Sequence, residues 1–230
     1  MKAILFDLDE TLISHHEQLC SFIEYQYSHN TDLQEIDFNE WKEKFIELDE
    51  NGYVIKELVY RTIISHFNLN SEIYDSLIEE FYSKFHMFVK PFKGSLELLQ
   101  YLKQSQLKLG IVTNGGTEIQ SKKIQQLNLH EYVDVILISE QENCEKPEPK
   151  IFNKALYLLD CEPEESYFVG DNIINDILGA KNVGMHTIFI ENKHSFNKND
   201  MEIYPDYSVK SLEELTDVLR NNLNNFTFKF

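Results

Sequence analysis

Lys2-Ala3-Ile4-Leu5-Phe6-Asp7-Leu8-Asp9-Glu10-Thr11-Leu12 is an apolar run that ends in two aspartates one residue apart. A buried strand of this kind delivers a carboxylate to the carboxyl edge of a sheet, where open α/β folds bind their ligands. Once the strand ends after Asp7, a tight loop can bring Asp9 back to the same cleft. One carboxylate would then be available for nucleophilic attack and the other for acid–base work. On its own, the pattern fits an acidic loop that caps a helix equally well.

The composition limits the class of partner. The chain has 230 residues and is 42% hydrophobic, which suits a core domain with a substantial insertion. A net charge of −18 disfavours nucleic acid and anionic membranes as partners, because like charges repel. Arg61 and Arg220 are the only arginines, so a cation and backbone amides would have to neutralise a phosphate substrate. We expect a small-molecule substrate, no nucleic acid, no membrane, and a monomer or homodimer.

The cysteines and the first residues bear on the cellular compartment. The three cysteines are irregularly spaced and form no CxxC pair, which favours reduced, mostly buried thiols. Asp7 and Asp9 interrupt the first apolar run too early for a signal peptide, and no uncharged run approaches the length of a membrane span. The sequence therefore predicts a soluble, cytoplasmic protein.

Most of the chain alternates between strand-like and helical patterns, which is typical of βαβ units. Strands are expected at 3–7, 107–113, 133–139, 167–170, 186–190 and 206–209, with helices at 117–127, 149–159 and 173–182. The expected fold is therefore an α/β, Rossmann-like parallel sheet with helices on both faces.

Between about Ile13 and Lys90 the pattern is helical instead, with apolar residues at three- and four-residue spacing. Helices are expected at 16–28, 38–48, 54–67 and 72–89. This divides the chain into a core domain of residues 1–12 and 91–230 and an inserted helical cap domain of residues 13–90. An insertion directly after the first strand could act as a lid. The Phe-rich tail, residues 221–230, carries no functional prediction.

Two further loops carry residues suited to a phosphate. Thr113-Asn114-Gly115-Gly116 joins a strand to a helix, so its hydroxyl, its glycine N–H groups and the helix N-terminus suit a phosphate-sized anion. An ordinary strand-to-helix turn would look the same. Lys146 precedes two closely spaced prolines that stiffen its loop, and it could point inward to balance carboxylates and touch a phosphate oxygen. Most loop lysines are solvated instead.

A second apolar strand ends in an acid. Tyr167-Phe168-Val169-Gly170-Asp171 would bring the Asp171 carboxylate to the same sheet edge as Asp7. Two acids from neighbouring strand ends suit Mg²⁺, a hard cation that keeps several waters. Asp176 could hold a metal-bound water or cap the following helix, and helix capping alone is the competing explanation for this pair.

In chain order the motifs are D-x-D-x-T at a strand end, a threonine at a strand end, a loop lysine and G-D-x-x-x-x-D. The set resembles the haloacid dehalogenase-like superfamily of phosphotransferases. The helical insertion looks like that family's type-1 cap, so the resemblance covers nearly the whole chain. It implies a Mg²⁺-dependent phosphatase that hydrolyses a small-molecule phosphate monoester, such as a nucleoside 5′-monophosphate or a sugar phosphate, through an aspartyl phosphate.

The resemblance also implies roles for single residues. Asp7 would be the nucleophile that becomes phosphorylated, and Asp9 would protonate the leaving oxygen and then activate water. Thr113 and the neighbouring groups of Asn114 and Gly115 would bind the phosphoryl oxygens.

The same resemblance implies a cation site. Lys146 would neutralise charge on the nucleophile and the phosphate, and would count among the catalytic residues. Mg²⁺ would be held by the Asp7 carboxylate, the Asp9 backbone carbonyl and the Asp171 carboxylate. Asp176 would support these ligands from behind.

The motifs do not decide which branch of the superfamily the chain resembles most. Asp9 favours phosphate over halide chemistry, because a halide leaving group needs no proton. Residues 112–151 look like the branch of pyrimidine nucleotidases and acylneuraminate phosphatases. A phosphomutase and a non-catalytic phosphate-binding module remain alternatives. Phosphonate-cleaving relatives use a cap lysine, but Lys42, Lys44 and Lys56 are expected on charged helix faces. The polar or aromatic cap candidates for substrate contact are His15, His16, Asn51, Tyr53 and Arg61.

Overall fold

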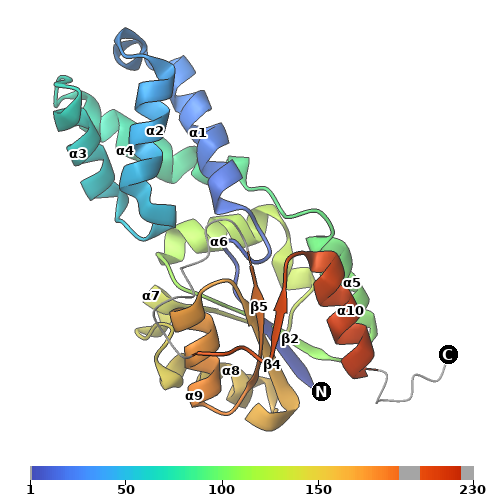
Figure 1. Cartoon of the computed structure of the whole chain (residues 1–230). Coiled ribbons are helices and arrows are strands. Elements are labelled where there is room, and N and C mark those ends of the chain that lie inside the picture. The colour runs from blue at the N-terminus through green and yellow to red at the C-terminus, as the bar shows by residue number, and fades with distance from the viewer. Residues whose placement is uncertain (1, 192–202, 224–230) are drawn as a thin grey trace. The chain divides into compact units, whose positions relative to one another are not determined.

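The computed structural model describes residues 2–191 and 203–223, so residues 224–230 of the Phe-rich tail lie outside the described residues (Figure 1). The chain divides into two compact units, which we describe separately. One unit consists of the segments up to Ile13 and from Pro91 onward, and the other is Ser14–Lys90. We call them the core unit and the helical unit.

The core unit is built on one sheet of six parallel strands in the order β3-β2-β1-β4-β5-β6. The strands are β1 (Ala3–Phe6), β2 (Lys108–Thr113), β3 (Val135–Ile138), β4 (Ser166–Gly170), β5 (His186–Ile190) and β6 (Tyr207–Val209). The predicted α/β, Rossmann-like fold is confirmed. Each strand agrees with the sequence-based expectation to within two residues at either end.

The first strand lies at the centre because it is apolar on both faces. All of Ala3–Phe6 is fully buried, as a parallel strand covered on both sides must be. Phe6 pairs with Ile111 of β2 on one side and with Val169 of β4 on the other. The chain order of the strands thus diverges at β1, and ligands of open α/β sheets bind outside the carboxyl ends at such a point.

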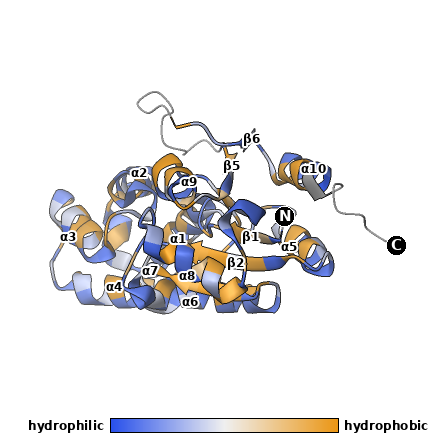
Figure 2. Cartoon of the chain, turned by 90° about the horizontal axis from the view of Figure 1, so that it is seen from below, coloured by the Kyte–Doolittle hydropathy of each residue, from blue (hydrophilic) through white to orange (hydrophobic). Residues whose placement is uncertain are grey.

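Helices cover both faces of this sheet. On one side lie α8 (Pro149–Leu159) and α9 (Gly179–Asn182), which pack against each other, and on the other side lie α5 (Ser95–Gln104) and α10 (Leu212–Leu223), which also pack together (Figure 1). The ring of Phe152 meets that of Phe168 edge to face at 5.1 Å between centroids. In Figure 2, β1 and β2 are largely hydrophobic, whereas α10 has a hydrophobic and a hydrophilic side. Among the described residues, the core unit also contains α6 (Thr117–Gln126) and α7 (Ser139–Glu142).

The helical unit consists of α1 (His15–His29), α2 (Phe38–Asp49), α3 (Lys56–His66) and α4 (Ile73–Lys84) around an aromatic core. Phe22 packs edge to face against Phe81, with ring centroids 5.3 Å apart. The buried amide of Gln26 accepts a 2.7 Å hydrogen bond from the Tyr60 hydroxyl and donates one of 3.0 Å to the Leu77 carbonyl. This satisfies a polar group that would otherwise be costly to bury.

Several elements differ from the expectations. The helix expected over 72–89 stops at Lys84, and Phe85–Phe88 forms a 3₁₀ turn. The helix expected over 173–182 begins as a wider π-helical turn, Ile173–Leu178, before α9. Helices α5, α7 and α10 were not predicted from the sequence, although Leu98, Leu99 and Leu102 of α5 are buried at helical spacing. No helix among the described residues is long and apolar enough to cross a membrane, and Cys20, Cys144 and Cys161 are free thiols.

Candidate active site

The first predicted acid is bound by the predicted lysine. The Lys146 ammonium donates hydrogen bonds to Asp7 Oδ1 at 2.6 Å and to Asp176 Oδ1 at 2.7 Å. Asp7 directly follows β1, and its backbone N–H still pairs with the Val169 carbonyl of β4. Lys146 is 3% exposed and Asp176 is fully buried, so this is a desolvated cluster and not a surface ion pair.

Burial and charge oppose each other in this cluster. Burial raises the pKa of Asp7 to about 7; the Lys146 ammonium acts in the opposite direction, and the charge of Asp176 adds to the rise. Burial by itself would lower the pKa of Lys146, but the Asp176 and Asp7 carboxylates raise it above its usual value. The lysine is therefore charged, and one ammonium serves two carboxylates. The remaining negative charge favours a cation.

Asp176 is held in place by the turn that precedes it. Its Oδ2 accepts a 2.9 Å hydrogen bond from the Asn172 backbone N–H, while the Asn172 side chain caps the N–H groups of Ile174 and Asn175. A Cβ atom on Gly170 would lie only 2.3 Å from Asp176 Oδ2. Glycine is thus required at the end of β4 for Asp176 to reach the site.

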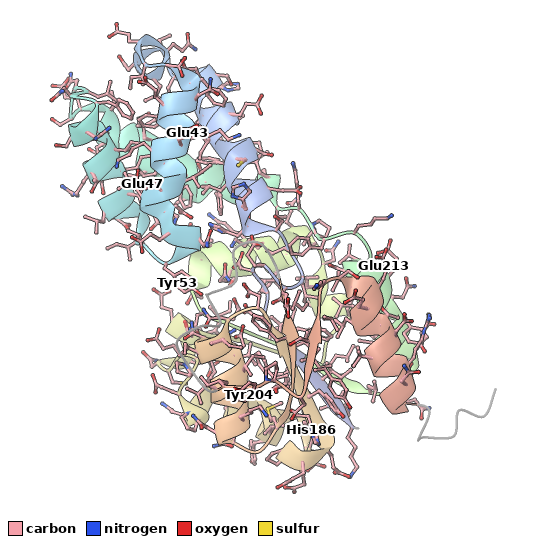
Figure 3. All side chains as sticks on the ribbon, viewed as in Figure 1. Glu43, Glu47, Tyr53, His186, Tyr204 and Glu213 are labelled. Atoms are coloured by element: carbon pink, nitrogen blue, oxygen red, sulfur yellow. The ribbon has the colours of Figure 1, made fainter. Side chains whose placement is uncertain are left out.

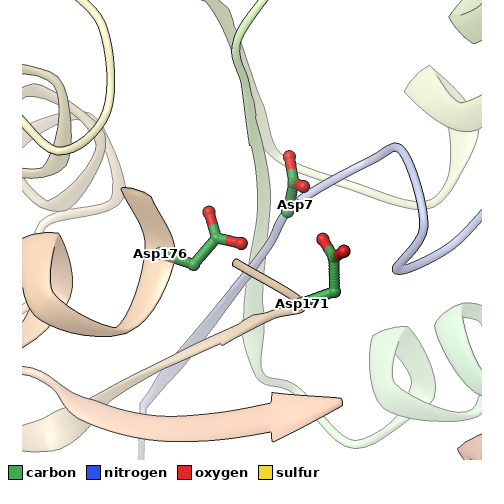
Figure 4. Close-up of side chains that lie close together, drawn as sticks. All are labelled: Asp7, Asp171 and Asp176. Atoms are coloured by element: carbon green, nitrogen blue, oxygen red, sulfur yellow. The ribbon is translucent and has the colours of Figure 1, made fainter. Parts of the chain in front are cut away.

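Three carboxylates converge at the same point (Figure 4). Oxygen atoms of Asp7, Asp171 and Asp176 all lie within 4.8 Å of one another, and Asp171 directly follows β4. Three hard, anionic oxygen donors from the ends of two neighbouring strands and the next helical turn match the ligand preference of Mg²⁺. The residues present therefore fit the predicted cation, and Asp176, predicted only as a supporting residue, offers an oxygen in the same cluster as Asp7 and Asp171.

The second predicted acid, Asp9, belongs to a different set of contacts. The loop after Asp7 folds back tightly, since both Leu12 and Ile13 donate backbone hydrogen bonds to the Leu8 carbonyl. Asp9 Oδ2 accepts a 2.8 Å hydrogen bond from Gln120 Nε2, which also donates to Thr113 Oγ1 at 2.7 Å. One amide on α6 thus joins the acid to the threonine at the end of β2.

Asp9 Oδ1 is paired with a lysine. The Lys123 ammonium lies 2.7 Å from this oxygen, and the Lys123 side chain is 2% exposed. Gln120 and Lys123 lie within residues 112–151, whose sequence resembles a nucleotidase branch, but neither was predicted to have a role. The available signal was their spacing, because residues three apart on a helix share a face.

The loop after β2, Thr113-Asn114-Gly115-Gly116, is called the threonine loop. It holds the loop that contains Lys146 through hydrogen bonds to the backbone of that lysine. Asn114 Nδ2 donates to the Lys146 carbonyl at 2.8 Å, and Asn114 Oδ1 accepts from the Lys146 N–H at 2.9 Å. The Gly115 N–H donates to Ser139 Oγ at 3.0 Å, and the Thr117 N–H to Glu140 at 2.7 Å. The Asn114 side chain, expected at the phosphate, therefore fixes the position of Lys146, and the Gly115 amide is engaged with Ser139, a residue the sequence analysis missed.

The residues of the helical unit that were predicted to contact substrate differ in burial and in their partners. His15 is buried and its ring lies 2.8 Å from Asp49, whereas Tyr53 is 61% exposed and is seen on the surface in Figure 3. Arg61 stacks over the Tyr74 ring at 4.5 Å. The expectation that Lys56 lies on a solvated helix face is wrong, since it is 6% exposed and its ammonium pairs with the buried Asp49. A buried carboxylate such as Asp49 is costly unless a cation pairs with it, which accounts for the inward position of Lys56.

The chain is similar to known hydrolases along most of its length. The family model described as haloacid dehalogenase-like hydrolase matches residues 4–190. The glyceraldehyde 3-phosphate phosphatase of Pyrococcus furiosus is 31% identical over 95% of this chain and 93% of its own. The pyrophosphatase PpaX of Bacillus cereus is 30% identical over 96% of this chain and 97% of its own.

A solved structure supports the same fold. The putative hydrolase YfnB from Bacillus subtilis, crystallised with magnesium, superposes with a TM-score of 0.75 at 22% identity, covering 95% of this chain and 98% of that one. The prediction of a phosphoric monoester hydrolase is confirmed at the level of the relatives, both of which are named as phosphatases. By the extent of the family match, this chain belongs to the haloacid dehalogenase-like hydrolases.

Proposed function

We propose that the protein is a Mg²⁺-dependent phosphatase that hydrolyses a small-molecule phosphate monoester through an aspartyl-phosphate intermediate. The observation that carries this proposal is the position of Asp7. It follows the central strand, it is bound by Lys146, and it faces two further carboxylates that suit a cation. A carboxylate in such a setting can act as a nucleophile towards phosphorus.

Asp7 and Asp9 divide the chemistry between them. A carboxylate oxygen of Asp7 attacks phosphorus, the bond from phosphorus to the leaving oxygen breaks, and Asp9 gives a proton to that oxygen. Asp9 then takes a proton from water, the water oxygen attacks the phosphorus, and inorganic phosphate leaves with Asp7 restored. Asp9 thus serves first as acid and then as base.

In this proposal the phosphoryl group is bound by a hydroxyl, backbone N–H groups and a lysine, without any arginine. The Thr113 hydroxyl and backbone N–H groups of the loop that follows it are the proposed donors, and Lys146 supplies positive charge beside Asp7. Gly115 and the side chain of Asn114 support this loop and its lysine. Phosphoryl transfer depends mainly on such positioning and charge compensation.

The carboxylates of Asp7 and Asp171 and the backbone carbonyl of Asp9 would hold the proposed cation, and Asp176 is the third carboxylate of the cluster. When bound, Mg²⁺ compensates the negative charge of the phosphoryl group. Such a cation would allow a chain of net charge −18 to accept an anionic substrate, because it would offset the excess negative charge of the acids at this edge of the sheet.

The substrate class is a small phosphorylated compound. The two named relatives act on glyceraldehyde 3-phosphate and on pyrophosphate, and residues 112–151 resemble a nucleotidase branch. We propose the helical unit as a cap domain that selects the leaving group. A soluble, cytoplasmic location and a monomeric or dimeric state remain part of this proposal.

The test is phosphate release from a panel of esters, measured with Mg²⁺ and with EDTA. The panel contains glyceraldehyde 3-phosphate, pyrophosphate, nucleoside monophosphates, hexose phosphates and 4-nitrophenyl phosphate. We expect Mg²⁺-dependent release that is abolished by Asp7→Asn. Transfer of phosphate between positions of a sugar without release would favour the phosphomutase. Binding of esters with neither release nor transfer would favour the non-catalytic module.

A further inference from the structure

Helix α6 buries two polar side chains that the proposed mechanism does not use. Gln120 and Lys123 are each 2% exposed, although their helix, Thr117–Gln126, is mostly polar. The adjacent Lys122 is 32% exposed and pairs with Glu118 on the same helix. An ammonium is costly to bury unless it is paired, so the burial of Lys123 needs a reason that Lys122 does not have.

Both buried side chains end on the same carboxylate. Lys123 Nζ lies 2.7 Å from Asp9 Oδ1, and Gln120 Nε2 lies 2.8 Å from Asp9 Oδ2. One donor on each oxygen fixes both the position and the plane of a carboxylate. The orientation of the Gln120 amide follows from its neighbours, because a carboxylate oxygen accepts hydrogen bonds and its partner must be the NH₂ group.

The glycine of the threonine loop makes room for this arrangement. A Cβ atom on Gly115 would lie 3.1 Å from Gln120 Cγ, and the Gly115 backbone has a φ of +145°. Gln120 passes beneath the loop, and its amide also donates to Thr113 Oγ1 at 2.7 Å. The side chain therefore fixes Asp9 relative to the proposed phosphate-binding threonine.

We propose that Lys123 and Gln120 are positioning residues that hold the Asp9 carboxylate in the place from which it exchanges protons with the leaving oxygen. This inference rests on the proposed phosphatase function. Helix α6 lies outside the four sequence motifs, and the inference gives it the role of fixing the position of the Asp9 carboxylate. Displacement of such a group by about 1 Å is enough to cost roughly 10²-fold in rate.

The leaving group provides a readout that general damage to the fold would not reproduce. An alkyl phosphate releases a strongly basic alkoxide and needs the proton from Asp9, whereas 4-nitrophenolate leaves readily without one. For Lys123→Met we expect the first step, measured by rapid quench as the initial burst of leaving-group release, to slow roughly 100-fold on the best alkyl phosphate but less than about 5-fold on 4-nitrophenyl phosphate. Hydrolysis of the aspartyl phosphate also uses Asp9 and should slow equally for both esters, whereas the Kd of each substrate should change little.

Two further variants make the result decisive. Lys122→Met on the same helix is the matched control and should leave both rates unchanged. Gln120→Met, which keeps the side-chain length and removes the N–H donors, should repeat the leaving-group pattern if Lys123→Met folds poorly. Equal slowing of the burst on both esters, or a rise in the substrate Kd with the burst rate unchanged, would overturn the proposal.

A measurement without turnover separates this inference from the proposed function. In a crystal structure of Lys123→Met, we expect the fold intact and the Asp9 carboxylate rotated away from its position in the native protein. A carboxylate that stays in place overturns the positioning role, whatever the activity. Native protein that releases phosphate from no ester overturns the proposed function, and the crystal structures then still decide whether Lys123 holds Asp9.

Discussion

Lys146 donates a 2.6 Å hydrogen bond to Asp7, a residue 139 positions away in the chain. The same ammonium is bonded to Asp176, so a single lysine closes a buried cluster formed by the end of β1, the loop before α8 and the turn after β4. The lysine loop is itself held by both polar atoms of the Asn114 side chain. Removal of Lys146 would therefore affect stability as well as catalysis.

For Lys146→Met we expect loss of turnover and destabilisation of the core unit by about 3 kcal/mol, because two buried carboxylates lose their cation. Hydrogen exchange of the β1 and β2 amides measures this change locally. The control is Lys154→Met, which removes an ion pair between Glu142 and a lysine side chain that is 46% exposed. An exposed pair is worth about 0–1 kcal/mol. Equal effects of the two variants would contradict a special role of Lys146 in stability.

Asp7 gives a pH-dependent prediction. Its pKa in the folded protein is raised from 3.8 to about 7, mainly by burial, so the folded state binds the proton more tightly than the unfolded state. Stability of the metal-free protein should therefore fall as the pH rises from about 4 to 7. Asp7→Asn should remove this loss and be more stable than the native protein by about 4 kcal/mol at pH 8, but not at pH 4.

Hydrogen exchange of the core amides in EDTA checks this sign across the pH range. Asp160→Asn is a suitable control, because Asp160 is exposed at a helix end in a left-handed conformation that asparagine tolerates. It should track the native protein at every pH. A native protein that gains stability between pH 4 and 7 relative to Asp7→Asn would contradict the raised pKa.

The residues that sequence reasoning found are those that follow buried strands. Asp7, Thr113 and Asp171 stand at or just after the ends of β1, β2 and β4, and an apolar run followed by a polar residue is enough to place them at one edge. Gln120 and Lys123 could not be placed in this way. Their partner, Asp9, lies 111 and 114 residues away, and only the packing of α6 shows that their side of the helix faces inward.

The sequence pattern also could not predict the local geometry of some helices. The π-helical turn Ile173–Leu178 depends on Asp176 reaching back to the Asn172 N–H and to Lys146, which are contacts of the fold and not of the periodicity. Similarly, Lys56 belongs to a helix whose pattern suggests a solvated face, but the burial of Asp49 draws its ammonium inward. In both the π-helical turn and the position of Lys56, pairing between residues far apart in the chain outweighed the local hydrophobic pattern.

Cation binding predicts a stability change that does not require turnover. Added Mg²⁺ should raise the Tm of the native protein, since a ligand at 100 times its Kd stabilises by about 2.7 kcal/mol. Asp171→Asn should abolish most of this shift, because it removes one of three converging carboxylates. The control Asp160→Asn should retain it. A full Mg²⁺ shift in Asp171→Asn would place the cation elsewhere.

Gly170 and Gly116 form a matched pair of glycines. A Cβ atom on Gly170 would lie 2.3–2.6 Å from three atoms of Asp176, whereas one on Gly116 would meet nothing within 4 Å. We expect Gly170→Ala to destabilise the core unit by about 1–3 kcal/mol and to weaken the Mg²⁺-dependent Tm shift. Gly116→Ala, at a φ of −69°, should leave stability within about 0.5 kcal/mol. Indistinguishable melting curves for the two variants would mean that Asp176 can move aside without cost.

The helical unit has its own buried charge cluster, and it should respond to acid. The fully buried Asp49 accepts hydrogen bonds from His15 and from the Gly52 N–H, at 2.8 and 2.7 Å, and pairs with Lys56. Burial would raise the pKa of Asp49, but these partners hold it well below its usual value. The stabilisation is therefore complete above the unfolded-state value of 3.8 and is lost as the pH falls through the lower folded-state pKa.

Asp49→Asn should consequently destabilise the helical unit by about 3 kcal/mol at pH 7 and by less as the pH is lowered below 4, because Asp49 then becomes protonated in the unfolded chain but not yet in the folded one. Trp41 is the only tryptophan of the chain and is buried in this unit, so its fluorescence during urea unfolding reports on the unit alone. Glu47→Gln is the control. Glu47 projects from α2 (Figure 3) with a side chain that is 69% exposed, and its pair with Lys44 should contribute little. If Asp49→Asn unfolds at the same urea concentration as Glu47→Gln at pH 7, the buried cluster does not stabilise the unit, and the loop around Gly52 must be held by its backbone alone.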